Sequence, residues 1–318
     1  MIRSKGLKLF AGNSNRKLAE AICHILEVPL GHGRIEKFPD GEIDVKIEED
    51  IRGVDTFFIQ STSPPVNDNL MEALLFADAA RRASAERITA VIPYYGYARK
   101  DRKDEGRVPI SAKMIANCMV SAGFDRVLTM DLHAAQIQGF FDIPVDHLYA
   151  APVINDYFRD LKQRLDVQNM TIVSPDVGRS KVARGYAKRL NAGLAIVDKR
   201  RVSGEQTEVM DMIGKVEDQV CVLIDDMIAT GGSIVDAAKA CMKFGAKEVY
   251  VACTHALFCG PAVERLKNAP IKECIVTDTV PVDGKEFDQL KVLSVADLLA
   301  EAIRRIHFSE SVSLLFKG

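Results

Sequence analysis

The feature that most constrains this chain is an acidic, glycine-containing turn between a short apolar run and a helical pattern. The apolar run, Val220–Ile224, is typical of a buried strand. It is followed by adjacent carboxylates, Asp225 and Asp226, and then by Thr230–Ser233, which reads T-G-G-S. Backbone N–H groups at a helix N-terminus attract phosphate, and paired carboxylates suit sugar hydroxyls or Mg²⁺. The segment therefore predicts a pocket for a phosphorylated sugar.

An ordinary strand–turn–helix connection is the alternative interpretation of this segment, because Gly makes turns and Asp caps helices. A lone D-D or G-G pair would favour that alternative, whereas the complete ordered string favours the phosphosugar pocket. The segment lacks the Lys of the P-loop pattern G-x-x-x-x-G-K-[ST], so the sequence does not support a nucleotide site of that kind.

Length and composition place the chain among globular proteins. Its 318 residues are enough for two domains, and 47% of them are hydrophobic against 27% charged. A net charge of −2 argues against a nucleic-acid partner, and no apolar stretch approaches the roughly 20 residues that span a bilayer. We expect a cytoplasmic protein with no nucleic acid or membrane as partner. The seven cysteines form no C-x-x-C pair and are expected to be free thiols.

Strand candidates alternate with helical patterns along the whole chain, which predicts an α/β fold with mainly parallel sheets flanked by helices. The strand candidates fall into two sets, so we expect one α/β domain at 1–149 and a second at 150–318. In such sheets ligands bind beyond the carboxyl ends of strands, where this chain concentrates Asp, Gly and Pro. The predicted strands are Lys8–Ala11, Thr56–Gln60, Arg87–Ile92, Arg126–Met130, Thr171–Ser174, Ala195–Asp198, Cys221–Ile224, Glu248–Cys253 and Glu273–Val276. The predicted helices include Arg16–Leu26, Leu70–Ala83, Ile110–Ala122, Lys181–Leu190 and Ile234–Phe244.

Cationic segments follow two of the predicted strands. Arg99–Lys103 has four cations in five positions, and Asp198–Arg201 has three cations that lead into a polar stretch at 202–207. Arg can bind phosphate oxygens with its fork of N–H donors, and a cationic loop can neutralise charge that develops during a reaction. Both segments therefore suit a polyphosphate, with a solvated charged loop as the alternative for each.

Three polar turns complete the candidate set. Phe38–Glu42 contains P-D-G, and on the residues alone a plain turn is favoured there over a base-binding site. His133 shares a strand end with Asp131, and Asp176 lies in an S-P-D turn after another strand. His and Asp both bind metals or phosphate ligands, with a structural role for each as the alternative.

Taken together, these motifs resemble those of the class I ribose-phosphate diphosphokinases, also called phosphoribosyl diphosphate synthetases. The resemblance runs nearly end to end and rests in addition on three long strings at 60–72, 131–142 and 299–307. It implies two phosphoribosyltransferase-like domains, an N-terminal one on the ATP side and a C-terminal one that binds ribose phosphate. The final helix and tail are expected to pack back on the N-terminal domain.

The resemblance also implies an activity. The β,γ-diphosphoryl group of Mg·ATP would be transferred to O1 of ribose 5-phosphate, giving AMP and 5-phosphoribosyl 1-diphosphate for nucleotide biosynthesis. Mg²⁺ is the implied cofactor, ATP the co-substrate, and a hexamer built from dimers the implied assembly. Positioning and electrostatics would supply most of the acceleration, so no protein nucleophile is required.

Individual roles follow from the same resemblance, residue by residue. The implied catalytic residues are Lys199 and Arg201. The implied ATP-binding residues are Phe38, Asp40, Glu42, Arg99, Lys100, Asp101 and His133, of which His133 is also an implied metal ligand together with Asp176. The implied ribose-5-phosphate-binding residues are Asp176, Asp225, Asp226, Ala229, Thr230, Gly231, Gly232 and Ser233. The positions that match an allosteric phosphate/ADP site between subunits are Asp50, Arg52, Ser84, Arg107, Ser311 and Ser313.

Several positions depart from the family pattern. Asp50 stands where Ser is common, which predicts a carboxylate near a phosphate and an unusual response to phosphate. Lys100 stands where Gln is usual, Arg179 where Gly is common, and Ser233 where Thr is common. Ala229 replaces an acid that can assist the nucleobase in phosphoribosyltransferases, so its absence argues against that activity. A catalytically silent regulatory homologue, associated with active subunits, is the other alternative; the cations of the 198–201 segment argue against it.

Overall fold

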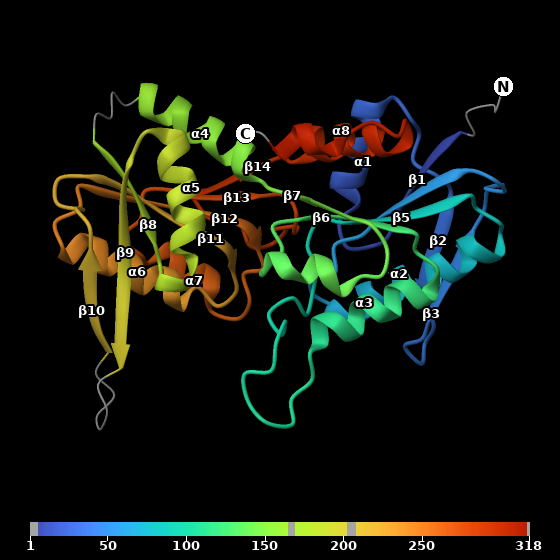
Figure 1. Ribbon diagram of the computed structural model, residues 1–318, viewed down its shortest axis with the longest axis horizontal. Helices are drawn as coiled ribbons and strands as arrows, with labels where there is room; N and C mark the ends of the chain where they lie inside the picture. The colour runs from blue at the N-terminus through green and yellow to red at the C-terminus, as the bar shows by residue number, and fades with distance from the viewer. Residues whose placement is uncertain (1–5, 165–168, 202–207, 317–318) are drawn as a thin grey trace. The chain divides into compact units, whose positions relative to one another are not determined.

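The computed structural model describes residues 6–164, 169–201 and 208–316 (Figure 1). The chain divides into two compact units. Unit 1 consists of Met1–Tyr149, Thr279–Pro281 and Ser294–Gly318, and unit 2 consists of Ala150–Asp278 and Val282–Leu293. Within the described residues, no helix combines the length and the apolarity that crossing a bilayer requires.

Unit 1 is built on a five-stranded parallel sheet in the order β1-β4-β5-β6-β7. Its central strands are buried at nearly every position, as expected where helices cover both faces of a parallel sheet. The strands are β1 (Leu7–Ala11), β4 (Asp55–Ile59), β5 (Arg87–Ile92), β6 (Arg126–Met130) and β7 (Val145–Leu148). A separate antiparallel hairpin consists of β2 (Gly33–Lys37) and β3 (Ile43–Ile47).

Helices cover both faces of this sheet, with α1 packed against α8 and α2 packed against α3 (Figure 1). The helices are α1 (Arg16–Leu26), α2 (Val66–Arg82), α3 (Ser111–Ala122), α8 (Ala296–His307) and the 3₁₀ segments η1 (Ala135–Phe140) and η3 (Val312–Phe316). The side chain of Asn15 caps α1 by accepting the Leu18 N–H at 3.3 Å. In the core, the rings of Phe58 and Phe76 stack at 4.1 Å between centroids.

A partly buried ion cluster joins helix α8 to the sheet of unit 1. The Arg87 guanidinium pairs with Asp55 and also donates to the Ile306 carbonyl at 3.0 Å, while His307 Nδ1 lies 2.7 Å from Asp55 Oδ2. The Asp55 side chain is 9% exposed. Asp55 is therefore the shared acceptor that joins β4, β5 and α8.

We expect Asp55→Ala to lower the free energy of unfolding by about 3 kcal/mol, because it leaves two partly buried donors without their buried acceptor. Urea unfolding of wild type and variant measures the difference. Asp78→Ala serves as the control, since it removes a solvent-exposed pair with Arg82 and should leave the midpoint nearly unchanged. Equal midpoints for wild type and Asp55→Ala would contradict the role given to the cluster.

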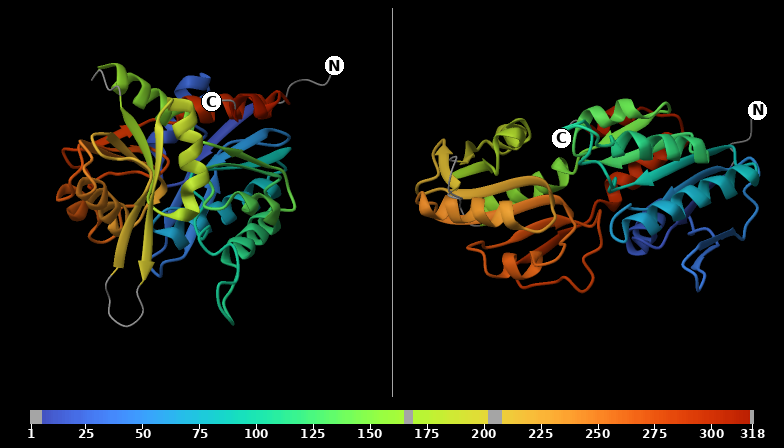
Figure 2. Two further views of the ribbon diagram at one scale, coloured as in Figure 1. Left: turned by 60° about the vertical axis from the view of Figure 1, so that its left-hand side comes forward. Right: turned by 90° about the horizontal axis from the view of Figure 1, so that it is seen from below.

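Unit 2 is built on a seven-stranded sheet in the order β10-β9-β8-β11-β12-β13-β14. The sheet is parallel except for its edge, where β10 runs antiparallel to β9 (Figure 2). The strands are β8 (Met170–Ser174), β9 (Gly193–Arg201), β10 (Glu208–Ile213), β11 (Val220–Ile228), β12 (Glu248–Ala256), β13 (Cys274–Thr277) and β14 (Leu290–Leu293). The helices are α4 (Ala151–Arg164), α5 (Ser180–Leu190), α6 (Gly232–Lys243), α7 (Ala262–Lys267) and the 3₁₀ turn η2 (Val177–Arg179).

The strand order of unit 2 reverses beside β8. From β8 the chain adds β9 and β10 on one side, and it then returns to place β11 on the other side of β8. In open α/β sheets a crevice for ligands forms at such a switch point, beyond the carboxyl ends of the two strands. Topology alone therefore marks the ends of β8 and β11 as the place for a ligand in unit 2.

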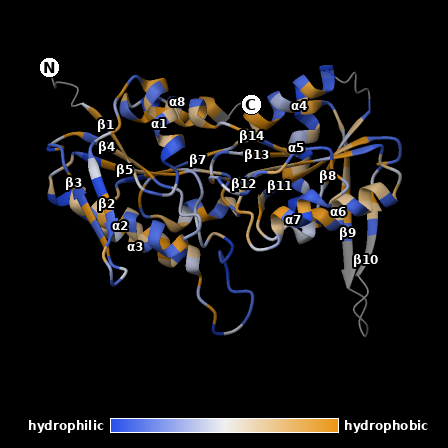
Figure 3. Cartoon of the chain, turned by 180° about the vertical axis from the view of Figure 1, so that it is seen from behind, coloured by the Kyte–Doolittle hydropathy of each residue, from blue (hydrophilic) through white to orange (hydrophobic). Residues whose placement is uncertain are grey.

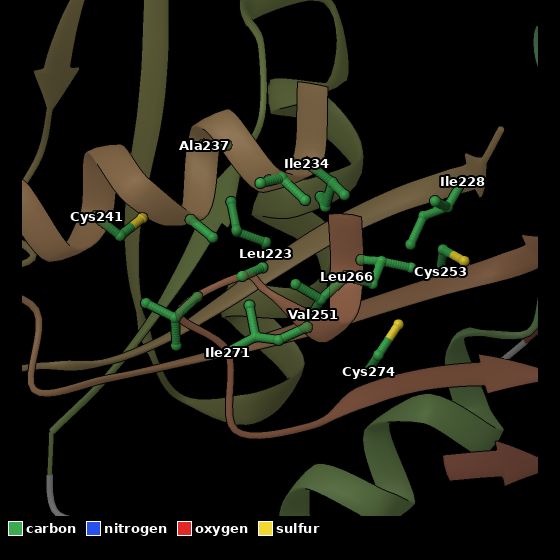
Figure 4. Close-up of a cluster of buried hydrophobic side chains, with 14 of the residues drawn as sticks. Leu223, Ile228, Ile234, Ala237, Cys241, Val251, Cys253, Leu266, Ile271 and Cys274 are labelled. Carbon is green, nitrogen blue, oxygen red and sulfur yellow. The ribbon is translucent and has the colours of Figure 1, made fainter. Parts of the chain in front are cut away.

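The core of unit 2 lies between this sheet and helices α6 and α7. Leu223 and Val251 project from the strands toward Ile234 and Ala237 of α6, with Leu266 of α7 alongside (Figure 4). The hydropathy of the residues agrees with this core, since the strands are more apolar than the loops that connect them (Figure 3). All seven cysteines are free and five of them are buried, which confirms the prediction of free thiols.

The predicted α/β class with mainly parallel sheets is confirmed, but β9, β11 and β12 run further than predicted, with β12 ending at Ala256 and not at Cys253. We expected β11 to end at Ile224, which would put both carboxylates in the following turn. It continues to Ile228, because β12 pairs with it through Ile228 and Ala256. In the same way β9 continues to Arg201, because β10 pairs with it along its whole length.

Candidate active site

The predicted sugar-binding residues gather at the switch point of unit 2. β8 and β11 pair directly, and their carboxyl ends therefore lie side by side. Asp176 follows the end of β8, and Asp225 and Asp226 lie in the last part of β11. The structure thus brings together the three carboxylates that the sequence assigned to ribose.

The T-G-G-S segment forms the start of helix α6. Gly231 has φ +76° and precedes the first helical residue, Gly232. Any residue with a Cβ would be strained at that φ, so Gly makes the turn from strand to helix possible. The first amides of α6 have no partners within the helix, and the helix dipole adds positive charge there. This end of α6 therefore has the backbone donors and the positive charge that the predicted phosphate site requires.

Residues far along the chain support this turn. The Cys259 N–H donates to the Ala229 carbonyl at 2.8 Å, and Arg265 Nη1 donates to the Thr230 carbonyl at 3.1 Å. Sequence reasoning missed Arg265, because its place beside the turn depends on α7 packing next to α6. A guanidinium beside the anion-binding end of α6 adds positive charge to that region.

The two carboxylates of β11 form an ion-paired group with Arg179. The Arg179 guanidinium pairs with Asp226, and its Nε lies 3.5 Å from Asp225 Oδ1. The Asp226 N–H donates to Asp225 Oδ1 at 2.8 Å, and the Arg179 N–H donates to Asp176 Oδ1 at 2.9 Å. The sequence had identified Arg179 only as a departure from the family pattern and not as a partner of these carboxylates.

Burial and two neighbouring charges together shift the pKa of Asp225. Burial, followed by the neighbouring charge of Asp226, raises the pKa of Asp225 to about 8, although the Arg179 cation lowers it. A carboxyl whose ordinary pKa is near 4 is therefore destabilised as an anion in the folded chain. Such perturbed groups concentrate at functional sites.

The predicted nucleotide-binding residues of unit 1 belong to two regions. Arg99, Lys100 and Asp101 lie in the loop after β5, and His133 follows β6, its neighbour in the sheet. A hydrogen bond of 2.8 Å from Gln136 Nε2 to Asp101 Oδ2 links the two strand ends. The hydrophilic loop between β5 and α3 is largely blue in Figure 3, and Arg99 and Lys100 are exposed in it.

The second region is the turn of the β2–β3 hairpin. The Phe38 N–H donates to the Glu42 carbonyl at 2.7 Å, and the Asp40 carboxylate accepts the Glu42 N–H at 3.1 Å. Phe38 is 50% exposed, so its ring is accessible. The hairpin packs on α2 through a 2.9 Å ion pair of Lys37 with Asp68. Asn13, which follows β1, donates to the Ile35 carbonyl at 3.2 Å, so the hairpin also lies beside a strand end of the sheet.

A buried histidine positions the turn that carries His133. His147 is 4% exposed, and its Nε2 accepts the Leu132 N–H at 2.9 Å. Asp131, at the start of this turn, has φ +39°, a strained value for a residue with a Cβ. The backbone on both sides of Leu132 is therefore held in a fixed conformation. No sequence signal distinguished His147 from an ordinary core residue.

We expect His147→Phe to destabilise unit 1 and to weaken binding of the ATP that the resemblance implies for the His133 turn, because a buried N–H loses its acceptor at a cost of about 1–3 kcal/mol. The measurements are KM for ATP and the thermal unfolding midpoint. Tyr149→Phe, a change to the neighbouring exposed ring, is the control. An unchanged KM for ATP in a folded His147→Phe variant would show that this turn does not serve the nucleotide.

The predicted catalytic cations lie on β9. The backbone of Lys199 pairs with Met210 of β10, and that of Arg201 pairs with Glu208. The cations end the strand, as predicted, but β9 runs beyond the predicted bound at Asp198, since β10 extends the pairing to Arg201. The side chains of Lys199 and Arg201, and the residues at 202–207, lie outside the described part of the chain.

Comparison with known proteins decides the family. A curated ribose-phosphate pyrophosphokinase from Rhodopirellula baltica is 56% identical over 313 residues, which are 98% of this chain and 98% of that protein. The chain belongs to the ribose-phosphate pyrophosphokinase family. The family predicted from the sequence is thereby confirmed.

Other comparisons agree with this membership of the pyrophosphokinase family. A model of the N-terminal domain of ribose phosphate pyrophosphokinase matches residues 7–123, and a model of the phosphoribosyl synthetase-associated domain matches residues 199–317. The ribose-phosphate pyrophosphokinase of Clostridium tetani is 56% identical over 98% of both chains. A crystal structure of phosphoribosylpyrophosphate synthetase from Mycobacterium smegmatis superposes with a TM-score of 0.91 at 42% identity, and covers 96% of this chain and 100% of that one.

The positions matched to the pyrophosphokinase family's allosteric site lie in three places of unit 1. Asp50, Arg52 and Ser84 come together, since Asp50 Oδ1 accepts the Arg52 N–H at 3.0 Å and Arg52 Nη1 donates to Ser84 Oγ at 3.1 Å. Arg107 lies in the loop before α3, with φ +63°. The hydroxyls of Ser311 and Ser313 lie 2.7 Å apart near the C-terminus.

The metal that the pyrophosphokinase family implies would need few protein ligands. Within the described residues no three His, Cys, Asp or Glu side chains are placed to hold a metal ion together. Mg²⁺ commonly binds one or two carboxylates together with substrate phosphates and water. The exposed Asp176, which the sequence assigned to the metal, fits an ion that arrives with the nucleotide. His133, the other assigned ligand, belongs to unit 1.

Proposed function

We propose that this chain transfers the β,γ-diphosphoryl group of Mg·ATP to O1 of ribose 5-phosphate, with AMP and 5-phosphoribosyl 1-diphosphate as products. Membership of the ribose-phosphate pyrophosphokinase family supports the proposal and confirms the predicted enzyme class. The observation that carries it is the pair of carboxylates near the end of β11, followed after three intervening residues by the T-G-G-S segment that begins α6 at the switch point of the sheet.

Unit 2 would supply the ligands of the sugar. Asp225 and Asp226 would accept hydrogen bonds from the ribose hydroxyls, with Asp176 on the neighbouring strand end. The 5-phosphate would bind the amides and hydroxyls of Thr230–Ser233 at the start of α6. Holding the sugar by both its hydroxyls and its phosphate leaves O1 in a fixed position, which is the main requirement for reaction with a bound donor.

Unit 1 would supply the ligands of the nucleotide. The exposed ring of Phe38 offers a plane for the adenine base, and Arg99 and Lys100 offer cations for the phosphate chain. Mg²⁺, when bound with ATP, would neutralise phosphate charge and polarise the transferred group. Lys199 and Arg201 would stabilise the negative charge that builds on the transferred group and on AMP as leaving group.

The assembly, the location and the regulation are further parts of the proposal. We propose a cytoplasmic homo-oligomer, a hexamer built from dimers, with small molecules as substrates and with no nucleic acid or membrane as partner. The Asp50–Arg52–Ser84 group would belong to a regulatory anion site. Because the Asp50 carboxylate already accepts the Arg52 N–H, we propose that phosphate activates this enzyme less than relatives with Ser at that position.

Incubation with ribose 5-phosphate and Mg·ATP, with and without inorganic phosphate, tests the function. AMP should appear together with a phosphoribosyl diphosphate, and should depend on ribose 5-phosphate. No AMP from folded protein, with phosphate present, would favour the silent regulatory homologue. Formation of a nucleotide from phosphoribosyl diphosphate and a nucleobase would instead favour a phosphoribosyltransferase.

A further inference from the structure

Arg179 contacts both carboxylates that we assign to the ribose hydroxyls. Its guanidinium pairs with Asp226 and its Nε lies 3.5 Å from Asp225 Oδ1. The Arg179 side chain is 17% exposed, against 18% for Asp225 and 8% for Asp226. A guanidinium so largely removed from water, between two fixed carboxylates, differs from the mobile cations of a protein surface.

The turn after β8 places this guanidinium. Ser174 Oγ donates to the Asp176 carbonyl at 2.7 Å, and Asp176 Oδ1 accepts the Arg179 N–H at 2.9 Å. These two bonds close the 3₁₀ turn η2, which ends at Arg179 where α5 begins. The backbone of Arg179 is therefore fixed by an aspartate of the same candidate site, at a strand end adjacent to β11.

The charges of Arg179, Asp225 and Asp226 allow the guanidinium to hold both carboxylates. Two adjacent buried carboxylates repel each other, and a planar guanidinium with several N–H donors is well suited to hold both. A carboxylate offers about four lone-pair sites, so it can accept from Arg179 and from a sugar hydroxyl at the same time. Arg179 need not leave when ribose binds.

We propose that Arg179 is a positioning residue for ribose 5-phosphate, whose guanidinium holds Asp225 and Asp226 in the orientation that accepts the ribose hydroxyls. The inference rests on the proposed function of the site. Arg179 acts through the two carboxylates and does not itself contact the reacting atoms. The proposal gives a role to a residue that the sequence analysis marked only as a departure from the family pattern.

Arg179→Met and Arg179→Lys test the proposal in the full-length protein. Met keeps an unbranched apolar stem and removes the guanidinium with its charge, whereas Lys keeps the charge and loses the fork. Calorimetric titration with ribose 5-phosphate alone should show affinity weakened about 10- to 100-fold in Arg179→Met, in line with losing hydrogen bonds to charged groups. KM for ribose 5-phosphate should rise to the same extent, while KM for ATP stays within about twofold of wild type. Arg179→Lys should recover part of the loss.

Lys188 is an exposed cation near the end of α5, the helix that begins after Arg179. Lys188→Ala is therefore the matched control, and it should give the wild-type result in both assays. If wild type neither binds ribose 5-phosphate nor makes AMP, the proposed function itself is wrong. If wild type is active and Arg179→Met binds ribose 5-phosphate equally well or more tightly, the positioning role is wrong. Equal increases in both KM values would also overturn it. If Arg179→Met does not fold, the split between the two KM values in Arg179→Lys decides in the same way.

Discussion

Replacing Asp225 with Asn is expected to stabilise the ligand-free protein while it lowers kcat/KM for ribose 5-phosphate by about 10- to 100-fold. At pH 8 and above, where at least about half of Asp225 is ionised, activity falls because a carboxylate acceptor of the sugar is lost, and such bonds to charged groups contribute about 1.5–3 kcal/mol. Stability rises because the amide removes a buried like-charge interaction with Asp226. We expect a gain on the order of 2 kcal/mol at pH 8, visible as a higher thermal midpoint.

The pH dependence of stability provides the check on this prediction. The pKa of Asp225 is about 8 in the folded chain, while in the unfolded chain it should be near the ordinary value of about 4. Between these values the folded chain keeps a proton that the unfolded chain has lost, so stability falls as pH rises from about 4 to about 8. Asp225→Asn should lose this part of the slope, and Asp288→Asn at an exposed position should keep it. Parallel curves for wild type and Asp225→Asn would contradict the prediction.

Replacing Lys199 with Ala is expected to have the largest effect on turnover. We expect kcat to fall by about 10²- to 10³-fold with little change in either KM, since the charge would act on the transferring group rather than on bound substrates. The measurement is the steady-state rate of AMP formation at saturating substrates.

Lys215→Ala is the control for the Lys199 prediction, because Lys215 is an exposed cation just beyond the partner strand β10. It should retain the wild-type rate. An unchanged rate in Lys199→Ala would show that this cation has no part in the transfer. The role of the β9 cations would then rest on Arg201 alone.

The elements that the sequence predicts well are those whose local pattern agrees with their environment. Arg87–Ile92 and Arg126–Met130 are apolar runs buried on both faces, and the predicted strand bounds match the structure. Arg16–Leu26 is a strongly amphipathic helix with an Asn cap, and it was also predicted correctly. At these positions the tertiary contacts favour the same secondary structure as the local sequence does.

The elements that the sequence did not predict depend on partners. β10 is a short edge strand with charged residues, and it exists because β9 pairs with it. The extension of β11 through Asp225 and Asp226 likewise depends on β12. Polar strand positions have no apolar period to reveal them, so sequence reasoning ended the strand at the first carboxylate.

The residues of the candidate site also fall into those with a local sequence signature and those placed by distant contacts. Asp176, Asp225 and Gly231 were predicted because strand ends and T-G-G turns have local signatures. Their distant partners, Arg179 and Arg265, were not. Arg179 reaches the carboxylates only because β8 lies beside β11, and Arg265 reaches the Thr230 carbonyl only because α7 packs near α6. Contacts of this kind follow from topology and are not readable from a local pattern.

The central claim is that this chain transfers the β and γ phosphoryl groups of ATP together to ribose 5-phosphate. The most direct measurement uses ATP labelled at both the β and the γ position and follows both labels through one turnover. The account predicts AMP and a ribose 5-phosphate derivative in equal amounts, with both labels on the sugar product. ADP with the β label retained and only the γ label on the sugar, or AMP released without ribose 5-phosphate, would contradict it.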